Sequence, residues 1–232
     1  VWATAGKSFS LTGMLQATVV RAVPIALAGL AGVLSERVAV INIGIEGMLL
    51  VGAFTGAVFG SLFGGVLGLL LAVFVGALFG LLLAVLVITY RVDQIIAGVA
   101  INILALGTTS FLTSHLLKSH PELNDAPIFK PIKIPFLSDL PVIGPTFFQH
   151  NFFVYGALLL IIASTFYLFK TGIGLRLRAV GEHPKAADTL GVNVLRLRYL
   201  NVTLAGMVAG FGGAWFTLGS VGRFDEAMTG GR

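Results

Sequence analysis

The sequence contains no cysteine, which excludes disulfides, thiolate metal sites and cysteine nucleophiles. Charged residues are also scarce. They make up 11% of the chain, less than half of the roughly 25% that is usual in soluble domains. No G-x-x-x-x-G-K-[ST] segment occurs, so the chain has no P-loop with which to hold ATP. These absences exclude thiol chemistry and P-loop nucleotide binding, and they argue against a water-soluble domain.

Residue patterns typical of catalysis or metal binding are missing as well. No two carboxylates have the spacing of a hydrolase site. The histidines lie in or beside expected loops without metal-ligand spacing on one helix; they are His115, His120, His150 and His183. We therefore predict no catalytic residue, no metal site and no cofactor, and we predict that the chain is not an enzyme.

Apolar residues and glycine dominate what is present. Hydrophobic residues make up 56% of the 232 residues, and there are 30 glycines. In a soluble fold much of this apolar surface would face water, which is unfavourable. Lipid is the solvent that fits, and small residues let membrane helices approach closely. The composition predicts an all-α polytopic membrane protein, with residues 1–232 forming a single transmembrane domain.

Long uncharged runs divide the chain into membrane spans. Between Glu46 and Arg91 lie 44 uncharged residues, and at about 1.5 Å per residue one helix of that length would be about twice the bilayer thickness. This run therefore forms two spans with a turn at GSLFGG (60–65). The first residue is not Met and no tail follows Arg232, so we expect a chain truncated at both ends. Six spans are predicted, at about 12–34, 40–60, 65–90, 94–117, 151–170 and 199–222.

The distribution of Lys and Arg predicts the orientation. Segment 170–198 holds six of them, whereas segment 118–150 holds three. Positive residues concentrate on the cytoplasmic side, so we expect 171–198 in the cytoplasm and 118–150 outside. The same alternation places the Glu36–Arg37 corner and Arg91 in the cytoplasm and residue 1 outside. Prolines at 121, 127, 131, 135, 141 and 145 predict that the external loop is a rigid, extended cap rather than a long helix.

Glycines recur every four residues along the second and third spans. They stand at 52, 56, 60, 64 and 68, and the pairs 76/80 and 206/210 repeat the spacing. Such a ladder makes a groove on one helix face. We favour helix packing as its role, and a glycine-lined substrate path is the alternative.

The stretch LSERVAVINIGIEGMLLVGAF (34–54) places polar groups at the start of an apolar run. Asn42 and Glu46 are four residues apart and would share one face of a helix. Ionisable groups at membrane depth are usually functional, so these two could line a translocation path. The favoured alternative is that they tie helix ends together near the interface. Glu36 and Arg37 are expected to form an interfacial ion pair.

The basic stretch 171–198 contains a short helix signal. Pro184 suits a helix start and Gly191 a helix end, which leaves barely two turns between them. One interpretation is a loop on lipid headgroups, anchored by flanking arginines. The other is a docking element for a cytoplasmic partner.

Three blocks together carry a family resemblance. The stretch 34–54, DQIIAGVAINILALGTTSFL (93–112) and the segment 177–232 closely resemble the permease subunit of bacterial ABC importers. The similar branch is that of simple sugars and nucleosides, within the family of ribose and branched-chain amino-acid permeases. The resemblance covers about residues 20–232. It implies a multi-pass protein of the bacterial plasma (inner) membrane, with more chain after Arg232.

The resemblance also implies partners and roles. A second permease subunit, identical or paralogous, completes the pathway; a cytoplasmic ATP-binding subunit supplies energy, and an extracytoplasmic binding protein delivers the solute. The residues that match the family's ATPase-coupling segment are Gly181, Glu182, Pro184, Ala186, Ala187, Asp188 and Gly191. Polar residues that could line the translocation path are Asn42, Glu46, Asn102, Thr108 and Asn201. Intramembrane aromatic rings, such as Phe54, Phe211 and Trp215, could stack on a base or sugar, although helix packing is the more common role.

We therefore predict a permease subunit that forms the path for nucleosides or simple sugars and is energised by a separate ATPase. The alternative is an ion-coupled secondary transporter for a small polar solute. That rival needs ionisable groups deep in the membrane, and only Glu46 and Asp93 are near candidates. A structural membrane protein without transport is a further alternative.

Overall fold

The computed structural model describes residues 11–133 and 143–230, and in them it confirms a helical membrane fold. Six helices are long and apolar enough to cross a membrane, at Thr12–Glu36, Ile45–Phe63, Gly65–Thr89, Gln94–Leu117, Phe152–Lys170 and Val194–Val221. Each matches one predicted span, with boundary shifts of a few residues.

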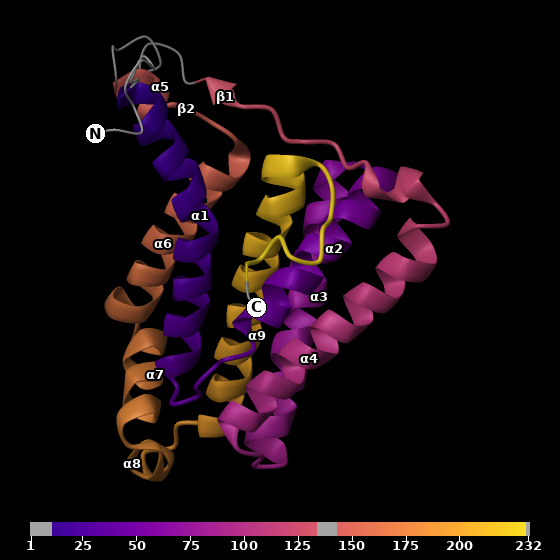
Figure 1. Cartoon of the computed structure of the whole chain (residues 1–232). Coiled ribbons are helices and arrows are strands. Elements are labelled where there is room, and N and C mark those ends of the chain that lie inside the picture. Colours follow the sequence, from indigo (N-terminus) through magenta and orange to yellow (C-terminus); the bar gives the residue numbers. More distant parts are fainter. Residues whose placement is uncertain (1–10, 134–142, 231–232) are drawn as a thin grey trace, which may run out of the picture.

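The helices follow one another along the chain as shown in Figure 1. They are α1 (Leu11–Glu36), α2 (Ile45–Phe63), α3 (Gly65–Ala84), α4 (Gln94–Leu112), α5 (Ile143–Phe147), α6 (Phe152–Lys170), α7 (Gly172–Glu182), α8 (Pro184–Thr189) and α9 (Val194–Ala214). The π-helical turns η2 (Val85–Thr89), η3 (Thr113–Leu117) and η5 (Trp215–Val221) extend α3, α4 and α9. A 3₁₀ turn η4 (Pro121–Asn124) and the antiparallel pair β1 (Ile132–Lys133) and β2 (Gln149–His150) lie in the connection between α4 and α6.

Glycine brings α2, α3 and α9 into backbone contact. A Cβ on Gly76 would lie 2.4 Å from the carbonyl oxygen of Gly206, and one on Gly52 would lie 2.6 Å from that of Gly210. Gly64, with φ of 89°, forms the predicted turn. The chain reverses direction there, so that Gly60 of α2 contacts Gly68 of α3. The packing role of the glycine ladder is confirmed, because no larger residue would fit at these crossings.

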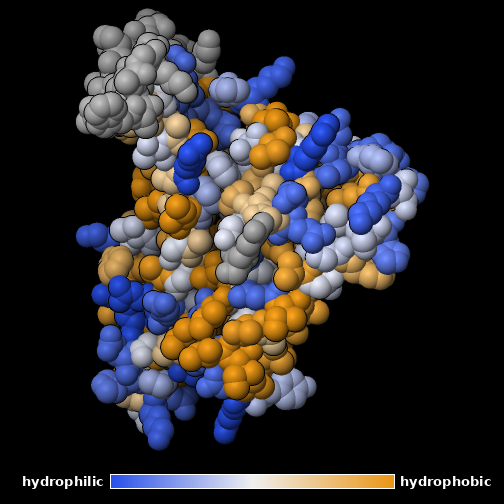
Figure 2. Space-filling view, viewed as in Figure 1, coloured by the Kyte–Doolittle hydropathy of each residue, from blue (hydrophilic) through white to orange (hydrophobic). Residues whose placement is uncertain are grey.

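The remaining long helices surround this core. α1 leans on α9 and also contacts α6, while α4 packs against α2 on the other side (Figure 1). Figure 2 shows apolar patches on the face in view. Large apolar side chains are exposed on the outer helices, for example Ile103 on α4 and Ile162 on α6, which are 67% and 69% exposed. Such a surface is stable only against lipid.

The structure corrects two boundaries and adds one helix. α2 begins at Ile45 rather than near residue 40, because the chain turns sharply at Ala39, whose φ is 56°. α9 begins at Val194 rather than 199, because the Asn193 side chain accepts the Arg196 backbone amide and caps the helix start. α7 was not predicted at all. Its start is capped by Thr171, which accepts the Gly174 amide.

The connection between α4 and α6 contains only short elements in its described parts. η4, β1, α5 and β2 have four, two, five and two residues, so the prediction that it forms no long helix is confirmed there. Pro135 and Pro141 lie outside the described residues, as does residue 1. The predicted orientation of this loop in the membrane stays a prediction.

Candidate functional site

Segment 37–44, between α1 and α2, is non-helical, and every second residue in it is buried. Val38 and Val40 are fully covered, and Asn42 is 7% exposed. Asn42 therefore precedes α2, and the prediction that it shares a helix face with Glu46 is wrong. Irregular backbone at membrane depth is tolerated only where protein covers it or where it lines a cavity.

Asn42 joins the end of α1 to the start of α2. Its Nδ2 lies 3.4 Å from the Ser35 hydroxyl oxygen and 3.8 Å from the Met48 sulfur. Its Oδ1 is buried and has no hydrogen-bond partner among the described residues. These contacts support the helix-tying role that the sequence favoured.

Asn102 of α4 holds the start of α2. Its Oδ1 accepts the Gly47 amide at 2.8 Å, and its Nδ2 donates to the Ile43 carbonyl at 3.1 Å. The first amides of a helix lack partners within it, so Asn102 supplies one from a neighbouring helix. Since Asn102 lies near the middle of the span Gln94–Leu117, α2 begins beside the middle of α4.

A cavity of about 230 Å³ opens beside this helix start. Glu46 and Asn102 both line it, so the structure brings these two predicted residues together. The other polar groups are Glu226 and Thr229, which come from the segment after α9. That segment folds back toward the middle of the bundle (Figure 1, yellow), where Ser110 donates to the Glu226 carboxylate at 2.7 Å. Two carboxylates thus face one small cavity between α2, α4 and the returning chain.

The other two predicted path residues lie elsewhere. The Thr108 hydroxyl donates to the Leu104 and Ala105 carbonyls of its own helix. Asn201 is fully buried on α9, where its Oδ1 accepts the Tyr167 hydroxyl at 3.4 Å. Neither residue lines the cavity at Glu46.

The aromatic candidates pack against other rings. Phe54 meets Phe224 edge to face, and Phe211 packs against Phe153 with ring centroids 5.1 Å apart. Trp215 lies against Phe216. These contacts support the packing role.

Glu226 and Thr229 were missed by the sequence reasoning. They belong to RFDEAMTGG (223–231), which resembles an ordinary polar loop after a span. Only the return of the chain places them against α4, so the local sequence carried no signal for them.

The predicted short helix at Pro184 is present as α8. Pro184 occupies its first position, and Gly191, with φ of 79°, follows its end. Ala187 faces inward and is 3% exposed, whereas Glu182, Ala186 and Asp188 are exposed. α7 and α8 together form a projection at one end of the molecule (Figure 1).

This projection is joined to segment 37–44. A Cβ on Gly181 would lie 2.6 Å from the Arg37 carbonyl oxygen, so the two backbones touch. Arg198 of α9 donates from Nε to the Val38 carbonyl at 3.1 Å. We call these contacts, through Gly181, Arg37, Val38 and Arg198, the α7 joint.

Arg37 does not pair with Glu36 as predicted. Glu36 is the last residue of α1, and Arg37 is the first residue of the turn that follows it. The guanidinium of Arg37 instead lies 5.6 Å from the centre of the Phe169 ring, and that of Arg178 lies 5.4 Å from the same ring. In the described parts of the chain, the ion pair found is that of His120 and Glu122.

The described residues contain no group of three or more His, Cys, Asp or Glu that could hold a metal ion. Two polar features that bear on the predicted site residues are the cavity at Glu46 and the projection of α7 and α8.

Comparison with known protein families bears on both features. The family described as the permease component of the branched-chain amino acid transport system matches residues 14–229. The chain belongs to this permease family. Membership makes it a multi-pass ABC permease subunit rather than an enzyme, as predicted, and favours an ABC permease over the ion-coupled transporter.

Curated relatives agree with this assignment. The permease is 45% identical over 88% of its length to the guanosine ABC transporter permease protein NupQ of Bacillus subtilis, covering 66% of that protein. It is 38% identical over 95% of its length to TsgC13 of Haloferax volcanii, a permease provisionally assigned to glucose, covering 67% of it. It is 35% identical over 90% of its length to the nucleoside ABC transporter permease protein NupC of Lactococcus lactis, covering 68% of it.

The chain thus spans about two thirds of the length of these relatives. No solved structure matches it.

Proposed function

We propose that this permease lines the membrane path of an ABC importer for nucleosides and receives its driving force at α8 from a separate ATPase. The observation that carries the proposal is the continuity of segment 37–44. Its Arg37 end touches α7 at Gly181, and its other end leads into the helix start that borders the cavity at Glu46. One non-helical stretch, with every second residue buried, therefore connects the exposed projection with the polar cavity.

The outward surface of α8 is the proposed ATPase contact. Glu182, Ala186 and Asp188 are exposed there, and Leu190 is 84% exposed just beyond the helix. A large exposed apolar side chain beside charged residues suits a protein interface. Ala187 and the two bounding residues, Pro184 and Gly191, shape the helix rather than touch the partner.

The cavity at Glu46 is the proposed solute contact. Nucleosides carry hydroxyl and N–H donors, and carboxylates are strong acceptors for both. Glu46 and Glu226 supply those acceptors, and Asn102 and Thr229 add an amide and a hydroxyl. Leu50, Ile103 and Leu106 form the apolar part of the wall, and such a combination of polar and apolar groups is typical of small-molecule sites.

The proposed mechanism is a mechanical one. Movement of the ATPase displaces α7 and α8, and the α7 joint passes this displacement to segment 37–44. The start of α2 then shifts against Asn102, which opens or closes the cavity at Glu46. The transporter completes its path with a second permease subunit and receives the solute from an extracytoplasmic binding protein.

The orientation proposed above follows from the same roles. If α8 meets the ATPase, segment 171–198 is cytoplasmic and segment 118–150 is external, as the Lys and Arg distribution predicts.

The test uses the full operon in membranes. Ala186→Trp adds a large ring on the exposed face of α8 and should abolish co-purification of the ATPase while leaving the amount of permease in the membrane unchanged. Ala100→Trp, at an exposed position of α4, is the matched control and should retain the ATPase. Full ATPase recovery with Ala186→Trp would overturn the docking assignment.

A second measurement tests the solute. Uptake of labelled guanosine should be ATP-dependent and should fall at least tenfold with Glu226→Gln, because the negative charge is lost and one acceptor oxygen becomes an NH2 donor. Unchanged guanosine uptake in that variant would place the solute elsewhere. The match to TsgC13 makes glucose the second candidate solute, and glucose uptake without nucleoside uptake would favour it.

A further inference from the structure

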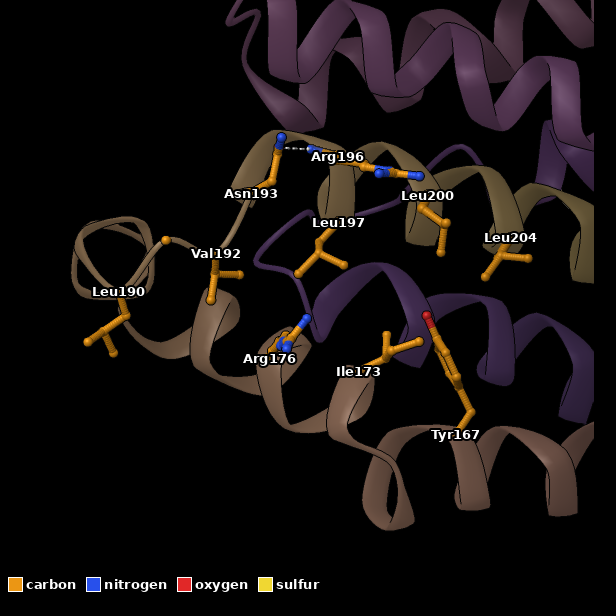
Figure 3. Close-up of a pocket in the computed structure, with 11 residues that line it drawn as sticks. Tyr167, Ile173, Arg176, Leu190, Val192, Asn193, Arg196, Leu197, Leu200 and Leu204 are labelled. Carbon is orange, nitrogen blue, oxygen red and sulfur yellow. Dashed lines mark hydrogen bonds between the residues drawn. The ribbon is translucent and has the colours of Figure 1, made fainter.

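A second, larger cavity lies where α6 ends and α9 begins, away from the cavity at Glu46. Its volume is about 630 Å³. One wall comes from the end of α6 and the start of α7, and the other from residues 190–204 (Figure 3). Leu190 and Gly191 at the end of α8 border this space, but the solute path proposed above does not involve it.

Two arginines stand on opposite walls of this cavity. Figure 3 shows Arg176 on α7 and Arg196 on α9. Both are exposed, and neither guanidinium has a hydrogen bond or ion pair within residues 11–133 and 143–230. None of the residues that line the cavity is acidic. The site is therefore cationic without an internal counter-ion.

Besides the polar Tyr167 and Asn193, the remaining side chains that line the cavity are apolar. Ile173 lies beside Arg176 on α7, and Leu200 and Leu204 continue along α9 into the membrane span (Figure 3). Leu204 is ten residues beyond the helix start at Val194, which corresponds to about 15 Å of helix. The arginines thus lie at the membrane edge of the cavity, and the apolar side chains of Leu200 and Leu204 lie at its end inside the bilayer.

We propose that this cavity binds an anionic phospholipid, with the headgroup phosphate between Arg176 and Arg196 and an acyl chain along Leu200 and Leu204. Arginine recognises phosphate oxygens through paired hydrogen bonds. Basic pockets between membrane helices are suited to anionic headgroups. A free phosphate would satisfy the arginines but would leave the apolar floor in contact with water, so the lipid is the better match.

The bound lipid would bridge parts of the chain that have few direct contacts. Tyr167 near the end of α6, Ile173 on α7 and Leu200 on α9 all border the cavity. A phospholipid there holds α6 and α7 against α9, directly behind the projection of α7 and α8. This role does not depend on which solute the permease carries.

The experiment measures lipid binding to the purified full chain in detergent by native mass spectrometry. Dioleoyl-phosphatidylglycerol and dioleoyl-phosphatidylcholine are titrated separately. The wild type should bind phosphatidylglycerol at least tenfold more tightly. The double variant Arg176→Gln/Arg196→Gln should lose that preference, because both phosphate contacts are removed.

The matched control removes two positive charges outside the cavity. Arg91→Gln/Lys185→Gln should keep the preference for phosphatidylglycerol, since neither residue lines the site. Equal loss in both double variants would show non-specific charge attraction and would overturn the proposal. Equal binding of the two lipids by the wild type would also overturn it.

Two further measurements distinguish a bound lipid from a bound free phosphate. Leu204→Trp fills the apolar floor while keeping both arginines, so it should weaken phosphatidylglycerol binding at least threefold even if the arginine variants fail to fold. Inorganic phosphate at millimolar concentration should not displace the lipid. If inorganic phosphate displaced phosphatidylglycerol, and Leu204→Trp bound phosphatidylglycerol as tightly as the wild type, the site would be one for free phosphate. That result would overturn the lipid assignment.

Discussion

The α2–α3–α9 core and the projection of α7 and α8 are held in place by different kinds of contact. In the core, backbone meets backbone at glycines, as at Gly76 and Gly206. At the projection, the glycine contacts of Gly174 with α6 and of Gly181 with Arg37 are supplemented by side chains, through the Arg198 hydrogen bond and the two arginines over Phe169. The first arrangement is close-packed along whole helices, whereas the second is a small joint.

This difference indicates which part of the permease can shift when the ATPase moves. Close-packed interiors transmit strain rather than absorb it. A joint made of a few polar contacts can shift without unpacking a helix, and it adjoins the non-helical segment 37–44. The core is thus the rigid frame, and the α7 joint is the part that can move against it.

The largest effect is expected from a methyl group in the core. Gly76→Ala places a Cβ 2.4 Å from the Gly206 carbonyl and 2.7 Å from the Gly210 Cα. Backbone atoms cannot rotate away, so overpacking should cost about 1–3 kcal/mol or more. The thermal unfolding midpoint of the purified permease in detergent should fall by several degrees.

Gly107→Ala is the control for this variant. Gly107 lies within α4, and nothing stands within 4 Å of its added Cβ. Its midpoint should hold or rise slightly, because alanine favours helix by about 1 kcal/mol over glycine. Equal destabilisation by both substitutions would remove the distinction of a close-packed core.

A methyl group at the α7 joint should affect transport more than stability. Gly181→Ala brings its Cβ to 2.6 Å from the Arg37 carbonyl and should push α7 away from segment 37–44. We expect ATP-dependent uptake to fall about tenfold at equal membrane abundance. Gly172→Ala, on the same helix with open space around it, should transport normally. If both variants transported at the wild-type rate, α7 would not be part of the transmission path.

A smaller effect is expected from removing the ring shared by two arginines. Phe169→Leu keeps an apolar side chain but loses the cation–π contacts of Arg37 and Arg178. Each such contact contributes about 0.5–1 kcal/mol at an exposed site. The unfolding midpoint should drop by a few degrees, whereas Phe166→Leu, with a ring 61% exposed on α6, should change it less. A larger drop with Phe166→Leu would show that general ring burial, rather than the arginines, matters.

The smallest effect is a pH dependence of the turn η4, through Glu122. This turn is attached to α2, because the Ser61 hydroxyl donates to the Leu123 carbonyl at 2.9 Å. A hydrogen bond from its own backbone amide, followed by one from His120, lowers the pKa of Glu122. A carboxyl whose folded pKa is lowered stabilises the fold above its unfolded pKa, and this contribution disappears as pH falls through the folded pKa. Because Glu122 is fully exposed, the change should be confined to the local turn.

Carboxyl NMR of the labelled permease measures this directly. Glu122 should titrate below the ordinary value for glutamate, and His120→Ala should move its pKa upward. A Glu122 pKa at or above the ordinary value would contradict the hydrogen bonds at η4.

Much of the fold could be predicted because its signals are local. The turn at Gly64, the bounds of α8 at Pro184 and Gly191, and the span Gln94–Leu117 all follow from residues adjacent in sequence. The start of α2 could not be predicted in this way. It depends on Asn102, which is 55 residues from its partner Gly47.

The site was predicted in part. Glu46 and Asn102 do line one cavity, but Thr108 and Asn201 do not. Glu226 escaped prediction because a carboxylate after a span normally faces water, and only the return of its segment brings it to Ser110. Long-range packing, rather than residue type, decides such neighbours.

The sequence by itself determined the solvent, the number of spans and the family, because apolar runs and contiguous motifs need no tertiary information. The tertiary structure alone decided that every second residue of segment 37–44 is buried, that the segment touches α7, and that Glu226 lines the same cavity as Glu46. Those contacts link residues far apart in the chain, and their geometry exists only once glycine has let α2, α3 and α9 close on one another.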